Sequence, residues 1–305
     1  MTVAAGPHLL SSELVYHITS NQENLNLQTL FGSSKYSAGI NKRIIIASGV
    51  TIGATTTGNY ALNIPSGFGG RILLVNQGSI LGAGGAANSG TGGNAINAGA
   101  SNIFIDNRGT ISSGGGGGGQ GGTGGAGYYT VSGTNNVYKG YSGVRYSSGP
   151  YYQLCQNACV QAFGDGSYCS VGCYLIPGQG GCGCPCWTIE AAGRGECNCC
   201  YRNESYSYNV STSGGAGGSG GRGQGYDGAA ASGSAGDAGG TNAGTGGTGG
   251  TGGSYGNSGN TGNTGSNGNS GSGAGGSGGG LAGFYIVNNG NVTWIANGTR
   301  NGRIG

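Results

Sequence analysis

The sequence predicts a mainly β protein in which a small β layer, formed by strands from both ends of the chain, holds a bundle of glycine-rich helices and a disulfide-rich insertion. Three observations predict this fold class. Runs of β-branched residues followed by Asn-x-Gly recur, glycine accounts for 79 of the 305 residues, and all ten cysteines lie between Cys155 and Cys200. Because only 7% of the residues are charged and aliphatic side chains are scarce, a conventional hydrophobic core is not available to the whole chain.

Residues 1–40 have an ordinary composition, with a polar segment rich in Asn and Gln. The short β-like runs begin only after this segment. We therefore expect it to attach the protein to a larger assembly rather than to belong to the β layer.

Residues 41–127 contain a repeated unit. An apolar run is followed by Asn-x-Gly-x-(Ile/Val) at 71–80 and 103–111, and again at 284–292 near the end of the chain. Asn and Gly tolerate positive φ, so each unit predicts a strand, a tight turn and a second short strand. Recurring units favour stacked turns of a β layer over independent hairpins. Residues 281–305 would then close the layer, and the chain between the copies would loop out and return.

Glycine-rich blocks follow the strands at 82–99, 114–127 and 213–280. In the last block glycine keeps a strict three-residue period from Gly244 to Gly271, and the absence of proline there argues against a collagen helix. The period suits an extended helix with three residues per turn, whose bare face lets neighbouring rods approach and share hydrogen bonds. A flexible Gly/Ser linker is the alternative, because fixing glycine backbone costs much conformational entropy.

The succession of apolar run, turn and glycine run occupies 44–53, 74–85 and 105–119, and a related segment occupies 290–302. This succession resembles the glycine-rich tail proteins of tailed bacteriophages, in particular the long-tail-fibre adhesins of T-even-like phages. The resemblance covers residues 40–127 and 210–305. It implies a bundle of polyglycine-II helices and attachment to a host surface molecule through loops at the distal end. The cysteine-rich stretch departs from this pattern.

Ten cysteines in a segment too small for a stable core favour a disulfide framework. Their pairing cannot be deduced from the sequence. Metal ligation is the alternative, although the Cys-x2-Cys spacing usual in zinc fingers occurs only once, between Cys197 and Cys200, and a mixture or free thiols is a third possibility. The cysteines are Cys155, Cys159, Cys169, Cys173, Cys182, Cys184, Cys186, Cys197, Cys199 and Cys200. Residues 153–163 form the one convincing helical run nearby.

Twelve of the 18 tyrosines lie between Tyr128 and Tyr208. Tyrosine offers a large amphipathic contact area at low entropic cost, which is why binding loops favour it. Alternatively, the rings cover the disulfide core, and both roles can hold at once. The receptor-binding candidates are Tyr128, Tyr129, Tyr138, Tyr141, Tyr146, Tyr151, Tyr152, Tyr168, Tyr174, Trp187 and Tyr201.

The composition argues against several classes of function. A net charge of +3 gives no basic surface for nucleic acid, and no run approaches the roughly 18 apolar residues of a membrane helix. The amino terminus lacks the features of a secretory signal, so cysteine oxidation would follow release by cell lysis. Matches to G-x-S-x-G arise by chance in glycine-rich sequence, and both histidines, His8 and His17, lie far from the cysteines in sequence. We expect no enzyme activity, no cofactor, no metal and no membrane insertion.

These observations and the resemblance predict a bacteriophage virion protein, extracellular after host lysis, that acts as a receptor-binding adhesin of a tail fibre or tail tip. Residues 1–40 would attach it, 41–127 and 281–305 would form the scaffold with the polyglycine-II region 213–280, and 128–212 would contact the host. The expected partners are other phage tail and fibre proteins and a host receptor, either a glycan or an outer-membrane protein. The protein would be a monomeric cap or a homotrimer. The alternatives are a passive structural component of the virion and a Cys-rich metal-binding protein.

Overall fold

The computed structural model describes residues 13–141, 167–169, 174–175, 182–183 and 199–305, with side chains for 13–135 and 204–305. The chain divides into two compact units, Met1–Tyr128 with Ser211–Gly305, and Tyr129–Val210. Strands dominate the regular structure of the described residues, so the mainly β class is confirmed.

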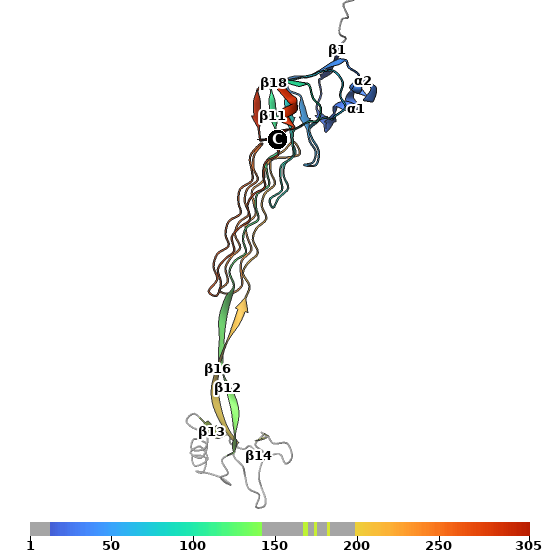
Figure 1. Ribbon diagram of the computed structural model, residues 1–305. Helices are drawn as coiled ribbons and strands as arrows, with labels where there is room; N and C mark the ends of the chain where they lie inside the picture. Colours follow the sequence, from blue (N-terminus) through green and yellow to red (C-terminus); the bar gives the residue numbers. More distant parts are fainter. Residues whose placement is uncertain (1–12, 142–166, 170–173, 176–181, 184–198) are drawn as a thin grey trace, which may run out of the picture. The chain divides into compact units, whose positions relative to one another are not determined.

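The strands of the first unit form three parallel sheets, and each turn of the chain adds one strand to each sheet. The first sheet contains β1 (Glu13–Ile18), β4 (Asn41–Ile46), β7 (Ile72–Asn76), β10 (Ile103–Asn107) and β18 (Val292–Ala296). The second contains β2 (Gln22–Glu23), β5 (Thr51–Gly53), β8 (Ser79–Leu81), β11 (Thr110–Ser112) and β19 (Thr299–Asn301). The third contains β3 (Leu25–Asn26), β6 (Leu62–Ile64), β9 (Ile96–Ala98), β17 (Phe284–Val287) and β20 (Arg303–Ile304). We call these five stacked turns the β stack (Figure 1).

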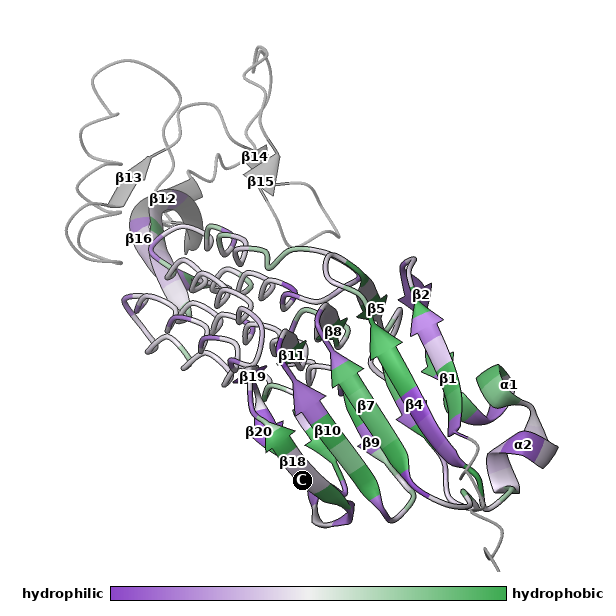
Figure 2. Ribbon diagram, turned by 90° about the horizontal axis from the view of Figure 1, so that it is seen from above, coloured by the Kyte–Doolittle hydropathy of each residue, from purple (hydrophilic) through white to green (hydrophobic). Residues whose placement is uncertain are grey.

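The β stack buries a narrow column of aliphatic side chains. Residues alternate between buried and partly exposed along β4 and β7, as expected for strands with one face in a core. The buried side chains repeat in register from turn to turn, since Ile44 pairs with Leu74 and Leu74 with Ile105. Figure 2 shows apolar residues concentrated in these strands, while the glycine-rich segments are nearly uncoloured. A chain poor in aliphatic residues therefore still completes a core, because the core is confined to the stack.

Two of the three Asn-x-Gly corners differ from the predicted tight turns. At the third, Asn288 has a φ of 61° and its carbonyl group accepts a hydrogen bond from the N–H of Asn291 at 3.0 Å, as predicted. None of Asn76, Gly78, Asn107 and Gly109 has a positive φ. The side chains of Asn76 and Asn107 are buried and hydrogen-bonded to each other. Glycine is required at 78 and 109 because a Cβ there would overlap a backbone carbonyl of the neighbouring turn. The motif therefore fixes the close stacking of successive turns.

The carboxy-terminal copy of the repeat lies in a different register from the predicted one. β17, predicted as the equivalent of the apolar runs in β7 and β10, instead joins the third sheet beside β9. The strands that continue β10 and β11 are β18 and β19, so residues 292–301 correspond to 103–112. An irregularity between Ile105 and Asp106 shifts the pairing with β18 and conceals this match in the sequence. Strands from both ends of the chain nevertheless complete the same sheets, as the repeat predicted.

Residues 13–40 form the first turn of the β stack, whereas the sequence placed them outside the β layer. Asn26 caps α1 (Leu27–Phe31), because its side chain accepts hydrogen bonds from the backbone N–H groups of Gln28 and Thr29. α2 (Ser33–Ser37) follows and buries Tyr36.

Lys42 of β4 is fully buried next to these helices. Its Nζ donates hydrogen bonds to the carbonyl groups of Ala38, Ile40 and Gly69 at 2.8, 2.8 and 2.9 Å. It also lies 4.3 Å from the centre of the Phe68 ring. Burial lowers the pKa of Lys42, and the three carbonyl acceptors compensate the desolvation of its ammonium group.

Glycine-rich segments leave the β stack at one corner, where the chain passes from the second sheet to the third. The excursion covers 54–61 in the second turn, 82–95 in the third and 113–283 in the fourth. Its extended segments lie side by side along the first unit (Figure 1) and are joined by backbone hydrogen bonds. We call them the glycine bundle; they are 82–93, 113–127, 213–225, 228–240, 243–254, 256–268 and 271–283.

Segment 113–127 is the centre of the glycine bundle. Most of its N–H groups from Gly118 to Gly125 donate alternately to two neighbouring segments. The N–H groups of Gly118, Gly121 and Gly124 donate to segment 213–225, at the carbonyls of Gly221, Gly218 and Gly215. The N–H groups of Gly119, Gly122 and Gly125 donate to segment 256–268, at the carbonyls of Asn260, Asn263 and Ser266. Its carbonyl groups accept from three further segments, including bonds from Ser89, Gly247 and Ala274. Between each two neighbouring segments the hydrogen bonds recur at every third residue. Glycine is needed at Gly121 because a Cβ there would overlap the carbonyl oxygen of Gly247.

The second unit contains the described parts of the insertion. β12 (Gly127–Tyr141), β16 (Cys199–Thr212) and β13 (Ser167–Cys169) form a sheet in the order β12-β16-β13. β14 (Tyr174–Leu175) pairs antiparallel with β15 (Cys182–Gly183). The helical run predicted at 153–163 lies outside the described residues.

Candidate functional site

Asp227 joins two segments of the glycine bundle close to the β stack. Its Oδ1 accepts a hydrogen bond from the backbone N–H of Gly84 at 2.8 Å, and Gly84 lies in segment 82–93 of the bundle, three residues after the end of β8. Its Oδ2 lies 2.6 Å from the guanidinium of Arg222, and its carbonyl group accepts a second bond from that group at 3.1 Å. One carboxylate therefore links two segments of the bundle to each other.

Tyr226 makes a second connection beside Asp227. Its ring lies against Gly53 of β5, where a Cβ would overlap the ring, and its hydroxyl donates to Glu23 Oε1 at 3.2 Å. Burial, and then the hydrogen bond and charge of Glu23, raise the pKa of the Tyr226 hydroxyl. The base of the bundle is thus fixed to the first two turns of the β stack.

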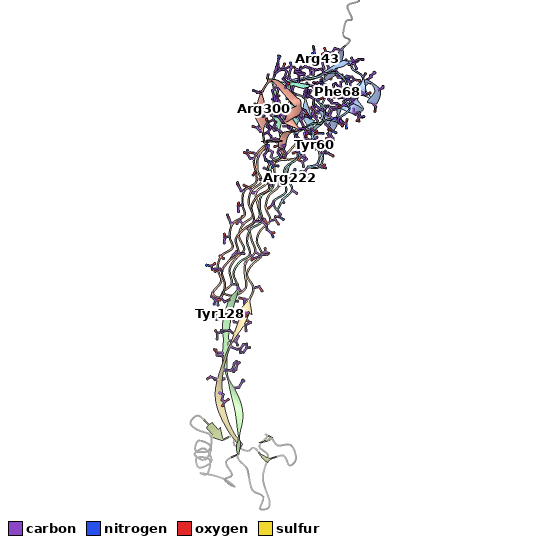
Figure 3. The ribbon with its side chains drawn as sticks, viewed as in Figure 1. Arg43, Tyr60, Phe68, Tyr128, Arg222 and Arg300 are labelled. Atoms are coloured by element: carbon purple, nitrogen blue, oxygen red, sulfur yellow. The ribbon has the colours of Figure 1, made fainter. Side chains whose placement is uncertain are left out.

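Two asparagines hold the chain where it enters the insertion. The carbonyl of Tyr128 accepts bonds from Nδ2 of Asn242 and Asn269, both at 3.0 Å, and its N–H donates to Asn269 Oδ1 at 2.8 Å. At the other end of the insertion, Thr212 Oγ1 donates to the carbonyl of Thr241 at 2.7 Å. Tyr128 is labelled in Figure 3. Both ends of the insertion are therefore held by the turns of the glycine bundle.

β12 and β16 form an antiparallel ribbon with two different faces. Thr130 Oγ1 donates to Asn209 Oδ1 at 2.9 Å, and Gly133 lies against the ring of Tyr206, which defines the register. Because side chains alternate between faces, one face presents polar residues, namely Thr130, Ser132, Thr134, Ser205, Ser207 and Asn209. The opposite face presents Tyr129, Val131, Gly133, Tyr206, Tyr208 and Val210, followed by Asn135 and Glu204. The ribbon is therefore amphipathic.

Tyr206 and Tyr208 lie next to each other on the apolar face. Their ring centres are 6.2 Å apart with an angle of 19° between the ring planes. The two residues are 39% and 56% exposed, which is high for neighbouring aromatic residues. Beneath Tyr206, a Cβ added at Gly133 would lie 2.6 Å from its hydroxyl oxygen and 2.7 Å from its Cζ. Glycine at 133 therefore allows the Tyr206 ring to lie across the neighbouring strand.

The receptor-binding candidates fall into three groups. Tyr128 and Tyr129 are described with their side chains and are 36% and 38% exposed. For a second group the structure describes the backbone strand alone: Tyr138 and Tyr141 in β12, Tyr168 in β13, Tyr174 in β14 and Tyr201 in β16. Tyr146, Tyr151, Tyr152 and Trp187 lie outside the described residues.

Four of the ten cysteines lie in described strands. Cys169 of β13 is the direct cross-strand neighbour of Cys200 in β16, and Cys182 of β15 is that of Leu175 in β14. Cys199 precedes Cys200 in β16. The other six, Cys155, Cys159, Cys173, Cys184, Cys186 and Cys197, lie outside the described residues. The predicted disulfides accordingly remain a prediction.

Sequence reasoning did not single out Tyr206 and Tyr208. The signal was present, because Tyr206, Tyr208 and Val210 alternate with Ser205, Ser207 and Asn209, the period-two pattern of an amphipathic strand. The candidates chosen from the sequence instead ended at Tyr201, next to the last cysteine. Elsewhere in the part of the chain that the structure describes, no group of three His, Cys, Asp or Glu residues is arranged to hold a metal ion. No helix among these residues is long and apolar enough to cross a membrane.

These features define a mainly β protein with a β stack and a hydrogen-bonded glycine bundle in one unit and a tyrosine-bearing ribbon in the other. Comparison with known proteins then assigns the chain to a family. The family model of the phage tail fibre adhesin Gp38 matches residues 13–186, more than half of the chain. The chain belongs to the Gp38 family of phage tail fibre adhesins, as the sequence resemblance predicted.

No curated protein matches the sequence. Among solved structures, the chain is similar to the gp37–gp38 adhesin tip complex of the long tail fibre of bacteriophage S16. The identity is 18%, the match covers 96% of this chain and 82% of that chain, and the TM-score is 0.40.

Proposed function

We propose that this protein is a virion-associated adhesin of a phage tail fibre or tail tip that contacts the host cell surface through its Tyr/Cys-rich insertion, residues 128–212. Membership of the Gp38 family supports the adhesin role. The observation that carries the assignment to the insertion is the pair of clamps at Tyr128 and Thr212, which hold both ends of the insertion on the glycine bundle. A segment held at both ends and rich in exposed tyrosine is suited to binding.

The glycine bundle serves as the stiff mount for the insertion, and its segments are polyglycine-II helices. Three features support this conformation. The hydrogen bonds recur at every third residue, the bonds run between segments rather than within them, and a Cβ at most inner glycines would overlap a neighbouring backbone. Such packing satisfies buried backbone groups without the use of side chains.

Disulfides fasten the insertion. Cross-strand residues in an antiparallel pair have Cα atoms about 4.5–5.5 Å apart, within the range that a disulfide spans. Cys169 and Cys200 have this relationship. A framework of such bonds would make a small segment rigid in the oxidising medium outside the cell.

The remaining parts of the chain serve assembly. Residues 1–40, which include the first turn of the β stack, attach the adhesin to other tail or fibre proteins, and the protein acts as a monomeric cap or a homotrimer without enzyme activity. The exposed first edge of the first sheet supports this role, since β1 is the outermost strand and carries Val15, which is 44% exposed.

Replacing residues 130–210 by a short Gly-Ser linker tests the proposal. The variant should keep the folded first unit, judged by circular dichroism and a cooperative thermal transition, and should lose binding to host cells. Intact adsorption by the folded variant would contradict the proposal and favour a passive virion component. Stoichiometric zinc with ten free thiols after anaerobic purification would favour the metal-binding alternative.

A further inference from the structure

We infer that Cys199 and Cys200, which are neighbours in β16, form two separate disulfides. Cys200 bonds to Cys169 of β13, and Cys199 bonds to a cysteine outside the sheet that β12, β16 and β13 form. This pairing specifies the disulfide framework of the proposed function and rests on it. It does not depend on which host molecule the insertion contacts.

The register between β13 and β16 places Cys169 and Cys200 directly opposite each other. The two strands are antiparallel, and all three residues of β13 pair with β16 without an irregularity. Directly opposite residues of an antiparallel pair lie on the same face of the sheet, with Cα atoms about 4.5–5.5 Å apart. A disulfide usually joins Cα atoms about 4.4–6.8 Å apart. A bond between Cys169 and Cys200 therefore fits the strand pairing as it stands.

Cys199 lies on the other face of β16. This strand runs without interruption from Cys199 to Thr212, and successive residues of a strand lie on opposite faces. Cys199 therefore shares no face with Cys169. A bond between Cys199 and Cys200 themselves does not suit an extended strand, because consecutive Cα atoms are only about 3.8 Å apart and the two residues lie on opposite faces. The partner of Cys199 must come from outside the sheet.

The same placement argues against a metal site shared by the two neighbouring cysteines. A zinc ion is surrounded by its ligands, and each cysteine sulfur lies about 2.3 Å from the metal. Because Cys199 and Cys200 lie on opposite faces of one strand, they cannot bind a single ion while β16 stays extended. Disulfides to two different partners are compatible with the strand.

Two bonds on opposite faces fasten β16 at its first residues. The bond between Cys169 and Cys200 closes the part of the chain that contains β14 and β15, and this closure restricts the unfolded chain. The bond also fixes the register in which Tyr168 lies opposite Tyr201, two of the receptor-binding candidates. A slip by one residue would move the residues of one strand to the other face. The disulfide therefore keeps these two tyrosines on one face.

Each bond forms by oxidation in the medium outside the cell. Two cysteine thiols exchange with one small-molecule disulfide in the medium, and the products are one protein disulfide and two small-molecule thiols. The two electrons and two protons of the cysteine thiols pass to the small molecule, so the step needs no other reactant.

The test maps the disulfides of the purified, oxidised full chain. Free thiols are alkylated, the unreduced protein is digested with pepsin at low pH to prevent exchange, and tandem mass spectrometry assigns each bond by fragmentation of the linked peptides. We expect one bond from Cys200 to Cys169 and a second bond from Cys199 to a different cysteine. A bond between Cys199 and Cys200, a bond from Cys169 to Cys199, or free thiols at both Cys169 and Cys200 would overturn the inference.

Single substitutions assign the partners independently, with each new thiol located by alkylation. Cys169→Ser should release one thiol, at Cys200, whereas Cys199→Ser should leave the bond between Cys169 and Cys200 intact. Cys182→Ser is the matched control, because the cross-strand neighbour of Cys182 is Leu175, and it should release neither Cys169 nor Cys200. Release of Cys199 by the Cys169→Ser substitution would contradict the pairing.

Binding of the same oxidised protein to host cells separates this pairing from the adhesin role. If the mapped bonds differ from the expected ones while the protein binds host cells, the pairing is wrong and the adhesin role stands. If the expected bonds are found and the protein does not bind host cells, the adhesin role fails and the pairing stands.

Discussion

The side-chain amide of Asn76 donates a hydrogen bond to Asn107 Oδ1 at 2.8 Å, across two neighbouring turns of the β stack. Asn107 continues this chain of contacts, because its own amide donates to the carbonyls of Asn297 at 2.8 Å and Thr299 at 3.2 Å. Residues nearly two hundred positions apart in the sequence are thereby joined at one corner. This corner joins the fourth turn of the stack to the fifth, the turn that follows the long excursion.

Asn107→Ala should therefore destabilise the first unit by about 1–3 kcal/mol, since the substitution removes three hydrogen bonds and leaves buried polar groups without partners. Gln77→Ala is the matched control, because Gln77 is exposed at the same corner. Urea unfolding measures the free energy of unfolding of both variants. An equal loss for the two substitutions would contradict the role of the asparagines.

The glycine bundle allows a matched comparison of two glycines. At Gly121 a Cβ would overlap the backbone of the neighbouring segment, whereas at Gly275 a Cβ meets nothing within 4 Å. Gly121→Ala should cost about 1–3 kcal/mol of unfolding free energy because the segments must separate. Gly275→Ala should be neutral or stabilise by roughly 0.4–1 kcal/mol through the unfolded state. If thermal unfolding ranks them in the opposite order, the close packing of the segments is wrong.

Asp227→Ala should destabilise the first unit by about 1–3 kcal/mol, because the partly buried N–H of Gly84 loses its acceptor. Arg222→Ala should cost less, about 0–1 kcal/mol, since the ion pair is partly exposed, with relative side-chain exposures of 33% and 28%. Asp237→Ala, an exposed position in the same bundle, serves as the control. Chemical unfolding at low and high salt separates the contributions, and only the ion pair should weaken with salt.

The buried hydroxyl of Tyr36 should make the folded protein less stable in alkaline solution. Burial raises the pKa of its hydroxyl to about 12, so the unfolded chain releases this proton at a lower pH than the folded one. The contribution is complete below pH 10 and falls by about 1.4 kcal/mol per pH unit as the pH rises from 10 toward 12. Tyr36→Phe removes this dependence but also the hydrogen bond from Tyr36 to the carbonyl of Pro65. The stability difference between the two proteins should shrink above pH 10, and a constant difference would contradict the prediction.

Much of the β stack could be predicted from the sequence, because the apolar runs at β4, β7 and β10 are long enough to show their pattern. The third sheet was missed since β3, β6 and β9 are only two or three residues long and contain asparagine. The tight turn predicted for Asn-x-Gly occurs at Asn288 alone among the three copies. It does not occur at Asn76 and Asn107, because local φ preferences do not anticipate a side chain that bonds to the next turn. The register of the last turn depends on one extra residue, Ile295 of β18, opposite the step from Ile105 to Asp106, and only the paired strands reveal it.

The candidate site was harder to predict. Tyrosine enrichment indicated the right segment, but the face of the ribbon depends on the register between β12 and β16, which Thr130 and Asn209 define from opposite strands. The period of three in the glycine blocks predicted contacts between segments. The period did not identify 113–127 as the central segment, because the period is the same in every block and only the folded structure shows which segments are neighbours.

Amide hydrogen exchange in the glycine bundle tests the central claim most directly, namely that backbone hydrogen bonds between glycine segments order the mount. The account predicts slow exchange at the inner donors Gly118, Gly121 and Gly122, and at Gly215, Gly218 and Gly221 with a period of three residues along the chain. Exchange at random-coil rates throughout 213–280 would show a flexible tether and contradict the account.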